Sequence, residues 1–104
     1  MAKAIINGKR YNTETAEEVA SWSNGYSRND FGFEEQTLYR TKKNVFFVYG
    51  EGGARSSYAQ SVGSSVTGGD RVQVLTDDEA YQWLEDHDQV EAIERVFPDR
   101  FEDA

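Results

Sequence analysis

The stretch from Glu35 to Ser61 constrains the fold most, because it holds the chain's densest run of apolar residues, Val45–Tyr49. Residues 37–41 and 45–49 are rich in the β-branched and aromatic residues that favour strands. Lys42-Lys43-Asn44 lies between them, and asparagine suits a left-handed turn position. The pattern therefore predicts a β-hairpin over residues 36–49.

The second strand of this hairpin is apolar on both of its faces. Two apolar faces are typical of a strand at the centre of a sheet that is covered on both sides. The alternative is a strand that presents one aromatic face to a partner protein. We expect the covered strand, and the turn leaves the register of the hairpin open.

The residues before the hairpin predict a short strand pair and then a helix. Residues 4–6 are apolar, and the Asn7-Gly8 dipeptide that follows is the strongest short signal for a tight turn between strands. We expect a helix over residues 14–23, because Thr15 and Glu18 have the spacing of a capping box. Small and apolar side chains also recur there at helical spacing; they are Ala16, Val19, Ala20 and Ser23.

The residues after the hairpin predict a turn of helix, a loop and a strand. Residues 56–62 are expected to form at least one helical turn, with Tyr58 and Val62 on its inward face. Residues 63–69 are rich in glycine and serine and predict a flexible loop. Residues 71–75 alternate apolar and polar side chains, which predicts a strand.

Two helices are expected near the end of the chain. Thr76 and Glu79 form the clearest capping box in the sequence and start a helix over residues 77–87. A second apolar stripe predicts a helix over residues 89–97, which Pro98 ends; its members are Val90, Ile93, Val96 and Phe97.

The expected fold class is α+β, with a small antiparallel sheet that contains a central hairpin and packs against about three helices. The length of 104 residues predicts a single domain over residues 1–104. Its core is expected to include Val19, Trp83, Leu84, Ile93 and Phe97.

Charge is distributed unevenly along the chain. The net charge is -8, and residues 1–50 sum to +1 whereas residues 51–104 sum to -9. An acidic half repels nucleic-acid phosphates, so we expect no direct nucleic-acid partner. It favours a basic protein surface as partner, and the plain alternative is a pair of solvated helix faces.

We predict that this partner is met by acidic residues of the two C-terminal helices together with Arg40 and Tyr49 of the hairpin. The acidic candidates are Asp86, Asp88, Glu91 and Glu94. The basic residues of the hairpin, Arg40, Lys42 and Lys43, also permit a head-to-tail contact between copies of the chain, so a homo-oligomer stays open.

A glycine elbow directly follows the apolar strand and offers an alternative function. Successive backbone N–H groups at such an elbow can bind the anionic group of a small ligand or nucleotide. The sequence lacks a complete phosphate-binding fingerprint, so a purely structural bend is the main expectation. The alternative site consists of Gly50, Gly52, Gly53, Arg55 and Ser56.

No pattern in the sequence predicts catalysis, a metal site or a cofactor. The chain has no cysteine, which excludes disulfides and thiolate chemistry. Its one histidine, His87, lacks a neighbouring nucleophile and is expected to be exposed at a helix end. We therefore expect a protein that is not an enzyme. Without an apolar segment long enough to span a bilayer or to serve as a signal peptide, it is expected in the cytoplasm.

Two segments, LYRTKKNVFFVYGEGG and VLTDDEAYQWLE, resemble a loosely defined group of small, mostly uncharacterised proteins from bacterial genomes, phages and mobile elements. The resemblance covers most of the chain. Asn44 stands where the group has glycine, which is compatible with the turn. The matching residues are Tyr11, Thr13, Thr15, Ala16, Leu38 to Lys43, Gly50, Gly52, Gly53, Leu75, Thr76, Ala80 and Trp83.

Small acidic proteins from the same setting include inhibitors of host defence systems, among them anti-CRISPR proteins. The analogy is one of setting and charge. It implies an inhibitor that binds a nucleic-acid-handling defence complex, whereas the residues themselves imply an acidic protein-binding module.

Overall fold

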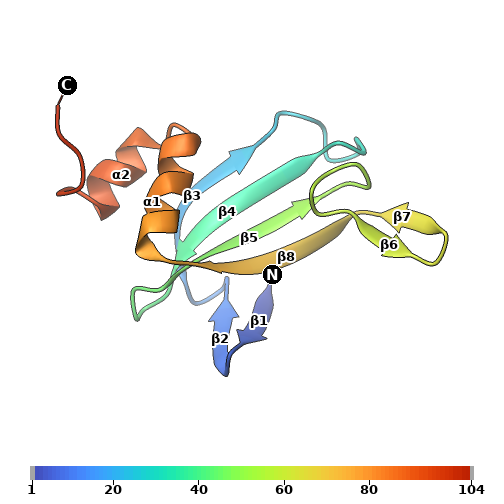
Figure 1. Cartoon of the computed structure of the whole chain (residues 1–104), viewed down its shortest axis with the longest axis horizontal. Coiled ribbons are helices and arrows are strands. Elements are labelled where there is room, and N and C mark those ends of the chain that lie inside the picture. The colour runs from blue at the N-terminus through green and yellow to red at the C-terminus, as the bar shows by residue number, and fades with distance from the viewer. Residues whose placement is uncertain (1, 104) are drawn as a thin grey trace.

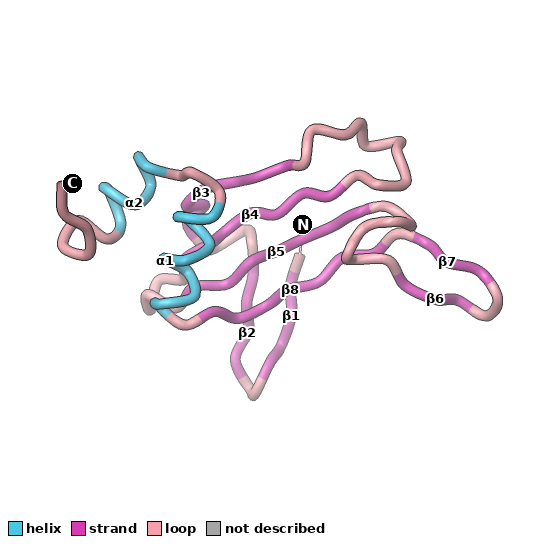
Figure 2. Tube along the Cα trace, turned by 45° about the horizontal axis from the view of Figure 1, so that its top comes forward, coloured by secondary structure: helices cyan, strands magenta, loops and turns pink. Residues whose placement is uncertain are grey.

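A four-stranded antiparallel sheet in the order β3-β4-β5-β8 forms the body of the protein (Figure 1). The computed structural model describes residues 2–103. Within these residues, two short hairpins and two helices accompany the sheet. The hairpin β6–β7 and the helices lie at opposite ends of the sheet in both views (Figures 1 and 2). The elements are β1 Lys3–Ile6, β2 Lys9–Asn12, β3 Glu17–Ser23, β4 Glu34–Arg40, β5 Phe46–Gly52, β6 Gln60–Val62, β7 Ser65–Thr67, β8 Gly69–Leu75, α1 Asp77–Asp86 and α2 Val90–Val96.

The predicted hairpin is confirmed as β4–β5. Its register pairs Leu38 with Val48 and Arg40 with Phe46, which settles what the sequence left open. The turn closes with a hydrogen bond of 2.9 Å from the Thr41 N–H to the carbonyl of Val45. Asn44 has a φ of 65°, the left-handed conformation that asparagine tolerates better than most residues.

Strand β5 lies between β4 and β8 and is covered on both faces, as its sequence predicts. Phe46 and Val48 are buried in the core on the side of the helices. Phe47 points to the opposite face because side chains alternate along a strand, and it is 0% exposed. Tyr11 from β2 covers it at a ring-centroid distance of 5.5 Å, and Tyr39 stacks beside it at 5.2 Å.

The predicted turn at the start of the chain is also confirmed. Asn7 and Gly8 have φ values of 53° and 78° and join β1 to β2 in an antiparallel pair. Positive φ at both central residues is the geometry that matches the twist of the flanking strands. This hairpin is what carries Tyr11 onto the second face of the main sheet.

The helix predicted over residues 14–23 is wrong, because this segment forms the edge strand β3. Its pairing with β4 shifts register between Glu18 and Ala20, so Val19 is the extra residue of a β-bulge. The bulge lets Val19 and Ala20 both enter the core. Two adjacent side chains that both face the core give the sequence an apolar spacing like that of a helix. Pairing with β4 overrides the helical preference of the segment.

The residues before β3 form a turn in place of the predicted helix start. The carbonyl of Asn12 accepts a hydrogen bond of 3.1 Å from the Ala16 N–H, and the Asn12 side-chain oxygen accepts one of 2.9 Å from the Glu14 N–H. One asparagine thus satisfies the backbone of the turn that leads from β2 into β3.

Helix α2 and Gln89, the residue that precedes it, bond to backbone carbonyls of the edge strand β3. The Gln89 side chain donates to the carbonyl of Ser21 at 2.8 Å, and the Arg95 guanidinium donates to the carbonyl of Val19 at 2.9 Å. Both carbonyls belong to a strand that pairs with β4 alone.

The capping box of α1 is confirmed. The Thr76 hydroxyl accepts from the Glu79 N–H at 3.1 Å, and the Glu79 carboxylate accepts from the Thr76 N–H at 2.8 Å. The described residues form two helices, α1 and α2, one fewer than expected. No helix within residues 2–103 is long and apolar enough to cross a membrane.

Residues 56–69 differ from their prediction. The chain turns after Gly53 and then forms the β6–β7 hairpin, so the helical turn over 56–62 and the loop over 63–69 are both wrong. Tyr58 is buried as expected, whereas Val62 is exposed on β6. The sequence of this segment has no clear strand pattern, and the hairpin forms because the two short strands satisfy each other's backbone hydrogen bonds.

The main core lies between the sheet and the helices. Of the five residues expected there, Val19 and Leu84 are buried, and Trp83, Ile93 and Phe97 are partly buried against the core. The Trp83 indole N–H donates to the side-chain oxygen of Gln36 at 2.6 Å. This bond joins α1 to β4 and satisfies the one polar atom of the indole.

Replacing Trp83 with alanine should lower the free energy of unfolding by about 3 kcal/mol, since it removes a large aromatic contact and leaves Gln36 without its partner. Urea denaturation of the variant and of the wild type measures the loss. Gln82→Ala, at an exposed position of the same helix, is the control and should change stability by less than about 0.5 kcal/mol. Equal stability of the two variants would contradict the core role of Trp83.

Candidate functional site

Four exposed carboxylates lie along the segment that ends α1 and forms α2. They belong to Asp86, Asp88, Glu91 and Glu94, which we call the acidic surface. Val90 lies among them in sequence and is 61% exposed. The sequence placed Val90 in the buried stripe, but it begins the helix on the side away from the core.

The carboxylates of the acidic surface form no ion pair with the residues that the structure describes. The ion pairs within residues 2–103 use the carboxylates of other residues, namely Glu17, Glu35, Glu51 and Asp78. Asp86 accepts one hydrogen bond of 2.8 Å from the Gln82 side chain. The acidic surface therefore keeps its negative charge available to solvent or to a partner.

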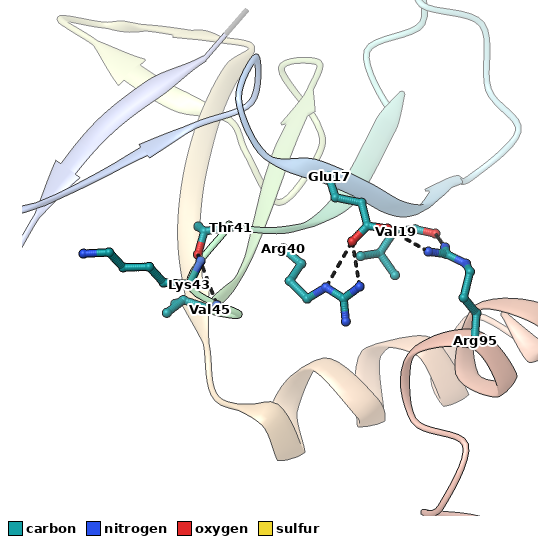
Figure 3. Close-up of polar contacts among 7 residues, drawn as sticks. All are labelled: Glu17, Val19, Arg40, Thr41, Lys43, Val45 and Arg95. Atoms are coloured by element: carbon teal, nitrogen blue, oxygen red, sulfur yellow. Dashed lines mark hydrogen bonds and ion pairs between the residues drawn. The ribbon is translucent and has the colours of Figure 1, made fainter.

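Arg95 is the basic residue of α2, and it turns toward the sheet. Its guanidinium donates to the Glu17 carboxylate at 3.1 Å and to the Val19 carbonyl at 2.9 Å (Figure 3). This contact leaves Glu91 and Glu94 as the charged side chains on the outer side of the helix.

Arg40 was predicted to contact a partner together with the acidic residues, and in the structure its guanidinium is engaged by Glu17. Its guanidinium donates to one Glu17 oxygen from Nε at 3.1 Å and from Nη2 at 2.7 Å (Figure 3). The hydrogen bond from Arg40 is the main reason that the pKa of Glu17 lies below its usual value, and Arg95 adds to it. Glu17 thus connects β3, β4 and α2.

Tyr49 lies on the face of the sheet that points away from the helices. Val48 faces the helices, so Tyr49 points to the opposite face of the sheet. Its hydroxyl donates to the Asp70 carboxylate at 2.8 Å. Burial, followed by this hydrogen bond, raises the pKa of Tyr49 above its usual value, so the hydroxyl stays a donor.

The glycine elbow packs against other parts of the chain. Strand β5 continues to Gly52, beyond the break expected at Gly50. A side chain at Gly50 would overlap the ring of Tyr58, and one at Gly52 would overlap Ser56 and the backbone of Phe33. The glycines are therefore needed for the close approach of these residues.

The backbone N–H groups of the elbow are engaged within the protein. Gly53 donates to the Phe33 carbonyl at 2.9 Å, Arg55 to the Phe31 carbonyl at 2.7 Å and Ser56 to the Gly53 carbonyl at 3.1 Å. The first two bonds hold the loop between β3 and β4, and an anion would have to displace the N–H groups from these partners. The geometry favours the structural role of the elbow over the ligand site.

His87 was expected to be exposed, but it lies in an aromatic environment that the sequence did not predict. It caps the end of α1 as expected, but its ring is half-buried between two tryptophans. It stacks on Trp83 at a centroid distance of 4.5 Å and meets Trp22 edge-on at 4.7 Å. The incorrect prediction of a helix over residues 14–23 is the reason that this contact was not foreseen. In a strand, alternate side chains share a face, so Trp22 points to the same side as the core residue Ala20. A helix would place these two side chains on different sides.

The environment of His87 favours its neutral ring. Nδ1 lies 2.9 Å from the carbonyl of Trp83. Burial lowers the pKa of His87, and the neighbouring charges of Asp86 and Asp88 oppose this shift without reversing it. Within residues 2–103, no three histidine, aspartate or glutamate side chains are placed to hold a metal ion.

The lowered pKa of His87 predicts a specific dependence of stability on pH. The unfolded chain takes up the proton near a pKa of about 6.5, whereas the folded chain does so only at lower pH. The free energy of unfolding should therefore fall as the pH decreases from about 7 to about 5. A His87→Gln variant should lose much of this slope in urea denaturation at successive pH values. A variant with the wild-type slope would contradict the assignment to His87.

Comparison of the chain with protein-family models, with curated protein sequences and with solved structures gives no match. The resemblance to phage and mobile-element proteins therefore stays a prediction from the sequence. The function has to be argued from the geometry and charge of the described residues.

Proposed function

We propose that the protein is a protein-binding module whose acidic surface engages a basic surface of a partner. The observation that supports this most is the exposed Val90 beside carboxylates that form no ion pair within the described chain. The proposal includes no catalytic step.

The arrangement on α2 supports the proposal. Ala92 is buried, and Ile93 and Val96 pack against the core, so the helix turns Val90, Glu91 and Glu94 outward. A single exposed valine is common on any protein. An apolar contact with a charged rim is the usual anatomy of an interface, because the apolar centre excludes water and the rim directs approach.

The chemistry of the acidic surface selects a partner rich in lysine and arginine. Their aliphatic stems can cover Val90 while their charged ends meet the carboxylates. Grooves that bind nucleic acid carry such residues. Together with the resemblance to phage and mobile-element proteins, this supports a narrower proposal: an inhibitor of a host defence complex, similar in its mode of action to anti-CRISPR proteins.

A triple charge reversal tests the proposal. Asp86→Lys, Glu91→Lys and Glu94→Lys should abolish capture of the partner from a lysate of the host, while the melting temperature stays close to that of the wild type. These side chains are exposed, and surface changes of this kind usually alter stability by less than about 0.5 kcal/mol each. Binding by the wild type should weaken as salt is added, because screening shortens the reach of the carboxylates.

The matched control reverses three exposed acidic residues near the C-terminus, Asp99, Glu102 and Asp103. It changes the net charge equally and should leave capture intact. An Arg55→Ala variant examines the alternative at the glycine elbow. If the triple reversal binds like the wild type and Arg55→Ala loses binding, the elbow rather than the acidic surface makes the contact.

A further inference from the structure

A cleft of about 420 Å³ separates the β1–β2 hairpin from the turn between β4 and β5. Its volume lies within the range of small-molecule sites. The floor contains the buried Tyr11 with Ala16 and Val45. Four exposed cations form the rim, namely Lys9, Arg10, Lys42 and Lys43, and none of the eleven lining residues is acidic.

The concentration of positive charge in the cleft is unusual for a chain with a net charge of -8. The rim holds four of the chain's 11 lysines and arginines. The ion pairs among residues 2–103 use Arg28, Arg40, Arg95 and Arg100, and none of the rim cations. Like charges around one cleft repel one another, and a bound anion would relieve that repulsion.

The acidic residue of an adjoining hollow, Glu17, already has basic partners. A second hollow shares Thr15, Ala16, Thr41 and Lys42 with the cleft and also contains Glu17. The Glu17 carboxylate is held by Arg40 and Arg95. Figure 3 shows the Lys43 side chain extending away from this group, so Glu17 does not compensate the charge of the rim.

Both walls of the cleft are held in place by the fold. Tyr11 anchors the first wall on Phe47. In the second wall, the Thr41 hydroxyl accepts from the N–H groups of Lys43 and Val45 at 3.2 and 3.1 Å (Figure 3). A preorganised site binds at a lower cost in conformational entropy than one that must form around its ligand.

We propose that this cleft binds a small organic anion, which places its carboxylate or phosphate at the cationic rim and its apolar or aromatic part on the floor. Lys42 and Lys43 would donate hydrogen bonds to the anionic group, and such charge-assisted bonds are stronger than neutral ones. The ligand is small because the rest of the protein is acidic and repels a longer polyanion. This site is independent of the acidic surface.

Titration of the isotope-labelled full chain, followed by NMR, tests the inference with four probes. Phenyl phosphate and benzoate should shift the amide signals of residues 8–16 and 41–45 to saturation, and the stronger of the two identifies the preferred anionic group. Inorganic phosphate lacks the apolar part and benzyl alcohol lacks the charge. Each should bind about tenfold more weakly than the preferred probe, which corresponds to about 1.4 kcal/mol of binding free energy.

The double variant Lys42→Gln/Lys43→Gln should reduce the affinity for the preferred probe by about tenfold or more, as expected for the loss of charge-assisted bonds. Lys3→Gln/Arg71→Gln removes the same charge at exposed positions outside the cleft and should bind as the wild type does. Equal losses in both variants, shifts without saturation, or tighter binding of a short single-stranded oligonucleotide would overturn the inference. Amide spectra of each variant confirm that it is folded.

Discussion

The burial of Phe47 near the start of β5 is the contact on which the rest of the structure depends. One face of this strand faces the helices, and the other would be open without the N-terminal hairpin. By covering Phe47, Tyr11 attaches β1 and β2 to the main sheet. The same contact places the hairpin opposite the β4–β5 turn and so creates the cleft between them. The burial of an apolar side chain of β5 therefore determines where the proposed ligand-binding cleft lies.

The sequence predicts the elements whose signals are local. The apolar run of β5, the left-handed Asn44 and the capping box of Thr76 depend on neighbouring residues, and all are found in the structure. Strand β3 could not be predicted in this way. Its bulge at Val19 exists only through pairing with β4, and the resulting pair of inward residues resembles a helical stripe. The β6–β7 hairpin likewise lacks an apolar pattern, since its valines are exposed.

The candidate sites were predictable to the extent that they lie in one segment of the chain. The acidic surface follows directly from the sequence of residues 86–94, and its carboxylates are exposed as the sequence suggests. Arg40 and Tyr49 were assigned by residue type, and their partners Glu17 and Asp70 are distant in sequence. The basic cleft brings together residues 8–16 and 41–45. Only the packing of Tyr11 on Phe47 reveals that these segments meet.

The contacts of α2 with β3 have a consequence for how copies of the protein behave in concentrated solution. An edge strand with free carbonyl groups can pair with a strand of another molecule and begin aggregation. Gln89 and Arg95 occupy the carbonyls of Ser21 and Val19, and the bulge at Val19 makes the edge irregular. The short second helix therefore protects one margin of the sheet from strand addition, which keeps a β-rich chain of this size from joining its own copies there.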